Sequence, residues 1–138
     1  MPQLKKLVIY LIYRKEKVLL EKRYKLGEKK FNNYIIPAGK VEKGEKPEQA
    51  LIREVKEEVN VKVEKYQLID SYIGLTLSNE RKKFFVYLVK EFDGSIKNNE
   101  PEKAEFKWVN TNSVEKYLTF ETSIKIVNSA KPFLPEFT

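Results

Sequence analysis

Cysteine and histidine are both absent from the 138 residues of the sequence. Their absence excludes disulfides, thiolate zinc sites, cysteine nucleophiles and every catalytic triad that contains histidine. Any acid–base chemistry must therefore use carboxylates, lysine or tyrosine, and any metal site must be built from oxygen ligands. Oxygen ligands suit hard cations such as Mg²⁺ or Mn²⁺.

Long hydrophobic runs are also absent. The longest uninterrupted apolar segment, Leu7–Tyr13, is far too short to span a membrane. No hydrophobic signal segment with a small-residue cleavage site follows Met1, so we expect a cytoplasmic protein. The length predicts a single domain over residues 1–138 with a modest hydrophobic core.

The charge balance is basic, with 27 Lys and Arg against 20 Asp and Glu, for a formal net charge of +7. A positive field of this kind attracts polyphosphate substrates. No ribonucleoprotein motif, zinc pattern or helix-turn-helix signature is present, so we expect no stable nucleic-acid partner. Abundant lysine and glutamate without cysteine is typical of a thermophile source.

The order of the predicted elements favours an α/β architecture in which a mixed sheet lies between two helices. Helical periodicity predicts one helix over residues 46–59, opened by Pro47, and a second over residues 121–130. The polar segment 24–33 is expected to be a loop. Apolar, β-branched segments predict strands within residues 4–13, 17–23, 34–36, 61–77, 82–92 and 104–110.

The first predicted helix carries an unusual group of carboxylates. On a helical wheel Glu54, Glu57 and Glu58 share an arc of about 100°. This arc adjoins the apolar stripe instead of lying opposite it. The stripe consists of Leu51, Ile52, Val55 and Val59.

Like charges at these spacings repel by roughly 0.2–0.5 kcal/mol per pair. Lys56 lies away from the group, and Arg53 reaches Glu57 but cannot neutralise three carboxylates. A bound divalent cation would reverse the repulsion. A charged helix surface with accidental spacing is the alternative interpretation of these carboxylates alone.

A longer pattern surrounds them. Residues 39–61, GKVEKGEKPEQALIREVKEEVNV, resemble the Nudix box, G-x5-E-x7-R-E-U-x-E-E-x-G-U, in which U is aliphatic. Eight of its nine defined positions match, namely Gly39, Glu45, Arg53, Glu54, Val55, Glu57, Glu58 and Val61. Asn60 replaces the last glycine of the box, and Asn is the next-best residue for the left-handed conformation expected there. Residues 37–42, PAGKVE, resemble the usual lead-in to the box, with Ala38 in place of its first glycine.

The resemblance implies an α/β Nudix fold, with a mixed sheet between the box helix and a C-terminal helix. It implies that Glu54, Glu57 and Glu58 coordinate Mg²⁺ or Mn²⁺, with the Gly39 carbonyl adding an oxygen. Arg53 would orient the carboxylates, and Glu45 would brace the loop before the helix. Such cations neutralise diphosphate oxygens and position a water.

A general base must take the proton of that water. In several Nudix proteins a glutamate shortly before an aromatic residue of a later strand does so. Glu100, Glu102 and Glu105 precede Trp108, and Glu102 has the favoured spacing. Glu57 is the alternative base within the box. A solvated turn is the other interpretation of the acidic residues before Trp108.

Four further residues are candidates for binding the substrate. Arg23 and Lys40 lie near the expected mouth of the site in sequence, where ordinary surface charge is the alternative. Tyr34 and Phe120 could stack on a base, although aromatic residues in strands more often belong to the core.

Among Nudix proteins the chain resembles most the branch that cleans nucleotide pools. This implies hydrolysis of 8-oxo-dGTP, or a related nucleoside triphosphate, to the monophosphate and pyrophosphate. ADP-ribose and dinucleoside polyphosphates are alternative substrates. A non-catalytic module that binds nucleotides or RNA is the alternative of another class. A monomer and a homodimer are both compatible with the sequence.

Overall fold

The computed structural model describes residues 4–23, 34–76 and 78–134, so the loop predicted at 24–33 lies outside the described residues. The helices are α1 (Pro47–Val59), α2 (Val114–Tyr117) and α3 (Glu121–Ala130), and a 3₁₀ turn, η2 (Lys131–Phe133), follows α3. The strands are β1 (Lys6–Arg14), β2 (Lys17–Arg23), β3 (Tyr34–Ile35), β4 (Ala38–Lys40), β5 (Lys62–Leu75), β6 (Arg81–Asp93) and β7 (Ala104–Asn110).

The predicted helices and strands are present, with two kinds of difference. Short elements such as α2 and η2 were not predicted, because four or three residues carry too little periodicity to be recognised. The segment after Pro37 was not predicted to form a strand. It instead forms β4, which pairs with β1 through Val8 and Gly39.

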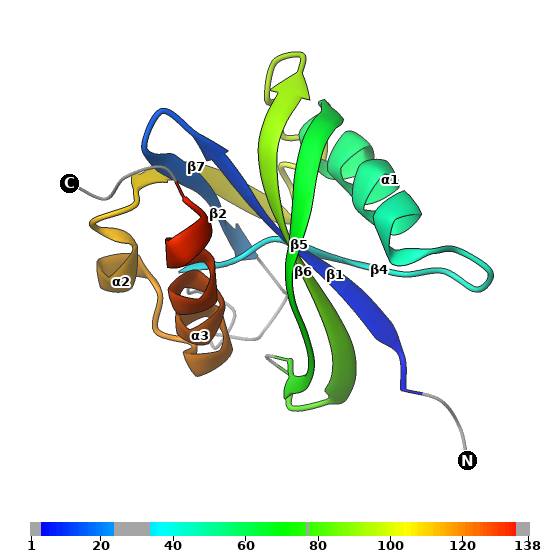
Figure 1. Ribbon diagram of the computed structural model, residues 1–138. Coiled ribbons are helices and arrows are strands. Elements are labelled where there is room, and N and C mark those ends of the chain that lie inside the picture. Colours follow the sequence, from blue (N-terminus) through cyan, green and yellow to red (C-terminus); the bar gives the residue numbers. More distant parts are fainter. Residues whose placement is uncertain (1–3, 24–33, 77, 135–138) are drawn as a thin grey trace.

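The sheet is mixed, as predicted. Its main strand order is β3-β2-β1-β6-β5, with β4 also paired to β1 and β7 to β2. β1 and β6 run parallel, whereas β1 and β2 form an antiparallel hairpin. Figure 1 shows α1 and α3 on opposite sides of the strands, which confirms the α/β sandwich.

β1 is apolar from residue 7 to residue 13 because both of its faces are covered. Ile9 and Leu11 belong to the core beneath α3, whereas Val8, Tyr10 and Ile12 belong to the core beneath α1. A strand covered on both faces needs a continuous apolar run, because alternate side chains point to opposite sides. β1 therefore holds the two layers together.

α1 is fixed at both ends. The Lys46 N–H donates to Gln49 Oε1 at 2.8 Å, and Pro47 occupies the first helical position. Asn60 ends the helix in the left-handed conformation with φ 66°, as the sequence predicted. Leu51 is fully buried, but Ile52 is 40% exposed, so its predicted place in the buried stripe is wrong. The sheet covers a narrower face of the helix than the wheel suggested.

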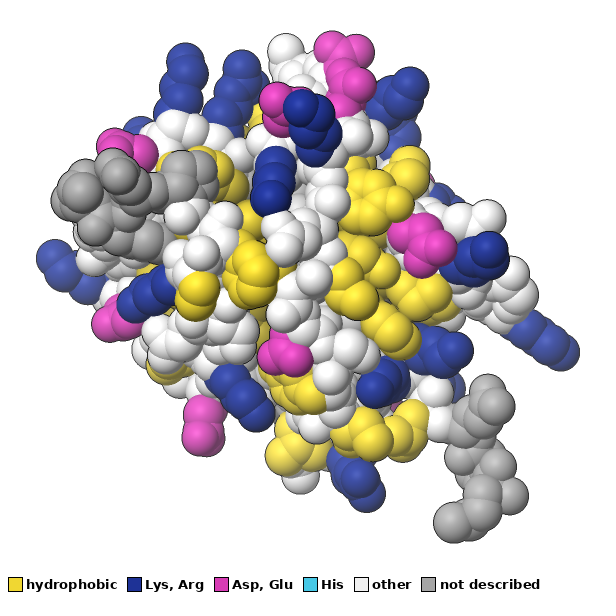
Figure 2. Space-filling model, viewed as in Figure 1, with side chains coloured by type: hydrophobic (Ala, Val, Ile, Leu, Met, Phe, Trp, Pro, Cys, Tyr) yellow, Lys and Arg dark blue, Asp and Glu magenta, His cyan; other side chains and the backbone are white. Residues whose placement is uncertain are grey.

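β5 is the outer strand beyond β6, and it leaves hydrophobic side chains exposed. Tyr66, Leu68, Ile73 and Leu75 are each 40–49% exposed. Figure 2 shows hydrophobic side chains gathered on this face of the molecule with Lys and Arg around them. No helix in the described ranges is long and apolar enough to cross a membrane.

Candidate active site

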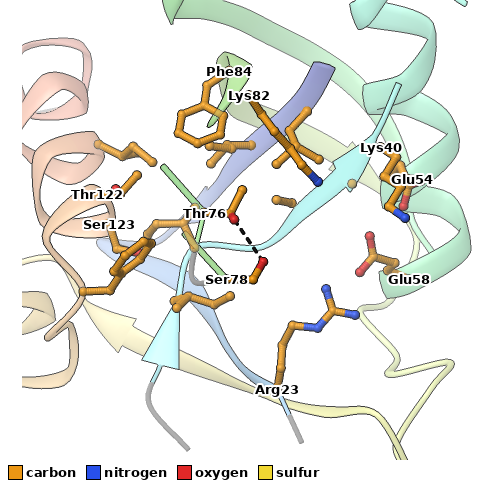
Figure 3. Close-up of a pocket in the computed structure, with 18 of the residues that line it drawn as sticks. Arg23, Lys40, Glu54, Glu58, Thr76, Ser78, Lys82, Phe84, Thr122 and Ser123 are labelled. Carbon is orange, nitrogen blue, oxygen red and sulfur yellow. Dashed lines mark hydrogen bonds between the residues drawn. The ribbon is translucent and has the colours of Figure 1, made fainter. Parts of the chain in front are cut away.

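A pocket of about 510 Å³ opens where β4 passes between α1 and the sheet face that carries α3. Its lining comes from segments far apart in the sequence: β1, β4, α1, the end of β5 with Thr76 and Ser78, β6 and the start of α3. Figure 3 shows carboxylates at one end of this pocket and Phe84 with α3 residues at the other. The pocket therefore has an acidic end and a largely apolar end.

Arg53 organises the acidic end. Its Nε and Nη2 donate to the two carboxylate oxygens of Glu45 at 2.8 and 2.9 Å, and Nη2 also donates to the Lys40 carbonyl at 2.8 Å. Its Nη1 donates to Glu54 Oε1 at 2.9 Å and to Glu57 Oε2 at 3.1 Å. One guanidinium thus ties together the loop before α1, the end of β4 and two carboxylates of α1, as a planar group with five donors can.

The pairing of Arg53 with Glu45 shifts the pKa values of both groups. Hydrogen bonds from Arg53 lower the pKa of the Glu45 carboxyl from 4.5 to about 2. Hydrogen bonding to Glu45 in turn raises the pKa of Arg53 above its usual value. Both groups therefore carry full charge at neutral pH.

Gly39 lies against the box helix without room for a side chain. A Cβ built at this position would overlap Glu54 Cγ and Cδ. The missing side chain lets Glu54 lie directly on the β4 backbone. This close approach brings β4, which carries the Gly39 carbonyl, next to the carboxylates of α1.

Buried oxygen atoms beneath the carboxylates lack hydrogen-bond partners. Among the described residues, Glu58 Oε1, Glu21 Oε1 and Tyr10 Oη are buried and accept or donate no hydrogen bond. Burial raises the pKa of Glu58, and neighbouring Glu54 and Glu21 raise it further. Burial likewise raises the pKa of Glu21 to about 7, although Arg23 acts in the opposite direction.

Glu21, which is only 1% exposed, was not predicted from the sequence to belong to the site. Its Oε1 lies 3.4 Å from Arg23 Nε. A charged residue directly after the apolar run at positions 18–20 of β2 was the available signal. The alternation of side chains along a strand does not show which residues lie across the sheet from it. Glu21 could therefore not be connected with the Nudix box from the sequence.

The donor set fits a hard divalent cation. Glu54, Glu57 and Glu58 line the same pocket, and the unpartnered oxygen of Glu58 is a ligand without a counter-ion. In the described part of the chain no three acidic side chains converge as ready ligands of one ion. Arg53 Nη1 instead holds Glu54 and Glu57 in this arrangement.

The predicted substrate-binding residues divide into two groups. Arg23, Lys40 and Phe120 line the pocket. Tyr34 does not, because its hydroxyl donates to Glu105 Oε1 at 3.1 Å and its ring packs edge-on against Tyr117. The neighbouring Ile35 lines the pocket instead, as strand alternation requires.

The three acidic residues before Trp108 are also separated. Glu100 lines the pocket, whereas Glu102 is exposed outside it. A turn closed by the Lys103 N–H donating to the Glu100 carbonyl at 2.9 Å places Glu102 at its tip. Asn98 holds the start of this turn by accepting from the Glu100 N–H at 2.9 Å.

Lys82 and several hydroxyls line the pocket and were not predicted. Lys82 comes from β6, Thr76 and Ser78 follow β5, and Thr122 and Ser123 belong to α3. Their sequence neighbourhoods resemble ordinary polar surface. Only the packing of α3 and the end of β5 over one sheet face brings them together.

Comparison with known proteins gives one family. Residues 3–137 match the family model described as the NUDIX domain. No curated protein sequence matches the chain.

Among solved structures, the MutT NUDIX hydrolase from Burkholderia pseudomallei is 24% identical with a TM-score of 0.77, covering 93% of this chain and 98% of that one. The E. coli ORF135 protein is 21% identical with a TM-score of 0.78, covering 95% and 91%. The NUDIX domain of Shewanella oneidensis NrtR, solved with ADP ribose, is 17% identical with a TM-score of 0.76, covering 98% and 90%. These likenesses show a shared fold.

Proposed function

The chain belongs to the NUDIX family, whose hydrolases generally use divalent ions such as Mg²⁺ or Mn²⁺, and we propose that it hydrolyses a nucleoside triphosphate to the monophosphate and pyrophosphate. 8-oxo-dGTP or a related triphosphate is the proposed substrate. The observation that carries the proposal is the continuity of the pocket: its acidic end holds Glu54, Glu57 and Glu58, and its apolar end holds Phe84 and Phe120.

The two ends suit the two parts of a nucleotide. Leu75, Phe84, Phe120 and Ile126 offer apolar surface for a nucleobase. Lys40 and Arg23 supply positive charge along the pocket, which favours a polyphosphate. A substrate spanning both ends would place its phosphates beside the carboxylates of α1.

In the proposed site Glu54, Glu57, Glu58 and the Gly39 carbonyl hold the divalent ion. The bound ion supplies charge neutralisation of the phosphate oxygens and lowers the pKa of water. Arg53 keeps Glu54 and Glu57 on one side of the pocket through its hydrogen bonds to both. Glu45 holds Arg53 in place through two hydrogen bonds.

We assign the removal of the water's proton to Glu100, with Glu57 as the alternative within the box. Glu100 lines the pocket, and Glu102, which the sequence favoured, lies on the exposed tip of the turn. A base must come within hydrogen-bond reach of the proton that it takes. Glu100 meets this requirement better because its side chain borders the same cavity as Glu54 and Glu58.

ADP-ribose is the second candidate substrate. The fold is shared with the Shewanella oneidensis NrtR domain solved with ADP ribose and with a protein described as an ADP compounds hydrolase. ADP-ribose also joins a base to a diphosphate, so the same two-ended pocket suits it.

The test is turnover of a substrate panel by the purified protein with Mg²⁺, including 8-oxo-dGTP, the common triphosphates, ADP-ribose and a dinucleoside polyphosphate. We expect release of pyrophosphate from a triphosphate and its loss in Glu57→Gln. Glu48→Gln is the matched control, since Glu48 belongs to the same helix but does not line the pocket. Turnover that survives Glu57→Gln would refute the proposed site, and no hydrolysis of any diphosphate-containing compound would favour a binding module.

A further inference from the structure

Lys82 of β6 lines the pocket. It occupies the same face of β6 as Phe84, and the strand register pairs Phe84 with Leu7 of β1 and Leu7 with Lys40 of β4. One strand therefore separates Lys82 from β4, at roughly 4.8 Å per strand. Figure 3 shows the Lys82 amine pointing into the pocket.

The amine of Lys82 is uncommitted. Among the described residues, none forms a hydrogen bond or ion pair with it, whereas Arg53 and Arg23, the arginines of the lining, are paired with glutamates. An ammonium group has three donors and no acceptor. Lys82 therefore offers the pocket hydrogen-bond donors only.

The hydroxyls of Thr76, Ser78 and Thr122 line the same pocket as Lys82, and each already donates its hydrogen within the protein. Ser78 Oγ donates its hydrogen to Glu80 Oε1 at 3.1 Å, so Thr76 Oγ1, 3.1 Å from Ser78 Oγ, must be the donor in that pair. Thr122 Oγ1 donates to the Leu75 carbonyl at 3.1 Å. Each of these hydroxyls is left with lone pairs, so toward a ligand they act as acceptors.

We propose that Lys82 is a specificity-determining residue that selects nucleobases with a carbonyl oxygen beside a ring N–H, as in guanine, hypoxanthine and uracil, over the amino-bearing adenine and cytosine. A charged donor prefers a carbonyl oxygen, and the lone pairs of Thr76, Ser78 and Thr122 accept from the adjacent N–H. An amino group in place of the carbonyl would face the ammonium donor to donor, which leaves both groups unpaired.

This inference rests on the proposed function for its kinetic readout, but its binding readout does not. The experiment compares ITP with ATP and UTP with CTP, since the members of each pair differ at one carbonyl or amino position. Catalytic turnover with Mg²⁺ gives kcat/KM for each triphosphate. Calorimetric titration with the monophosphates of the same four bases gives affinities whether or not the chain hydrolyses anything.

We expect the wild type to favour the carbonyl-bearing member of at least one pair by about tenfold or more. Lys82→Met keeps an unbranched side chain of similar shape and removes the ammonium donors, and it should reduce that ratio to about threefold or less. Lys83→Met is the matched control. The Lys83 side chain lies over the Phe85 ring and does not line the pocket, so this change should leave the ratio intact.

Three results would overturn the inference. The first is a wild type without preference in either pair, or without affinity for any of the four monophosphates. The second is a preference that persists in Lys82→Met. The third is a loss of kcat/KM or of affinity in Lys82→Met that is equal for all four bases. Such a loss would assign the lysine to the phosphates. A base preference in binding that Lys82→Met removes, without hydrolysis of any triphosphate, would support the inference while refuting the proposed function.

Discussion

The Gly39 backbone and the Glu54 side chain lie in such close contact that a methyl group on Gly39 would overlap Glu54 Cγ and Cδ. The contact joins β4 to the box helix at the acidic end of the pocket. The requirement for glycine at position 39 is therefore steric and does not depend on an unusual backbone angle.

Gly39→Ala should therefore displace Glu54 and weaken binding of Mn²⁺ by about tenfold or more, as loss of ligand positioning usually does. Titration calorimetry measures the affinity. Gly44→Ala is the control, because Gly44 has φ +83° and open space around it. That change should cost about 1–2 kcal/mol of stability through backbone strain and leave Mn²⁺ affinity unchanged. Equal affinities of Gly39→Ala and the wild type would contradict the steric account.

The Glu45–Arg53 pair should make stability depend on pH in the acid range. Hydrogen bonds from Arg53 lower the pKa of Glu45 from 4.5 to about 2. Because the folded pKa lies below the unfolded one, the stabilisation is complete above about pH 4.5 and is lost as the pH falls toward 2. Glu45→Gln should show a shallower loss over this window in urea unfolding. The exposed Glu64→Gln should follow the wild type, and a slope unaffected by Glu45→Gln would exclude the pair as its source.

Glu21 should affect the pH dependence of stability in the direction opposite to Glu45. Burial raises its pKa from 4.5 to about 7, so the folded state retains a proton that the unfolded state has lost. Its contribution is most favourable below about pH 4.5 and is lost as the pH rises through 7. Relative to the wild type, Glu21→Gln should gain up to about 3 kcal/mol of unfolding free energy between these pH values. Urea unfolding with a chelator present checks this, and a pH-independent difference would show that Glu21 is ionised throughout.

Asn60 ends the box helix with φ 66°. Glycine adopts this conformation without a Cβ penalty, so Asn60→Gly should raise the free energy of unfolding by about 0.5–1 kcal/mol. Asn60→Ala should lower it by about 1 kcal/mol, because alanine lacks the tolerance of asparagine for this region. Thermal unfolding measures both. Turnover should be unchanged in Asn60→Gly, and reduced stability of that variant would show that the Asn side chain contributes more than its backbone angle.

Much of the fold was accessible to sequence reasoning because its signals are local. The apolar run of β1, the period of α1 and the Asn60 cap each follow from residues close together in the chain. Ile52 shows the limit, since a helical wheel gives the apolar side but not how wide a face the sheet covers. Short elements such as β4 carry no periodicity of their own and exist because β1 offers them a partner.

The candidate site likewise contains residues whose shared role is readable from the sequence and residues whose role is not. The carboxylates of α1, together with Arg53 and Glu45, lie within one turn-and-helix segment, so their spacing already indicated a shared role. Glu100 could not be separated from Glu102 in this way, because a turn set by Asn98 and Lys103 decides which one borders the pocket.

The sequence by itself determined the family resemblance, the architecture of a mixed sheet between two helices and the acidic group of the box helix, since these depend on residue type and local spacing. Only the tertiary structure placed Glu21 beneath that group and Lys82 in the same pocket. Strand register and the packing of α3 over the sheet decide such contacts, and these depend on residues far apart in the chain. The physical reason is that a local pattern fixes which face a side chain takes, whereas its neighbours across that face come from the long-range pairing of strands.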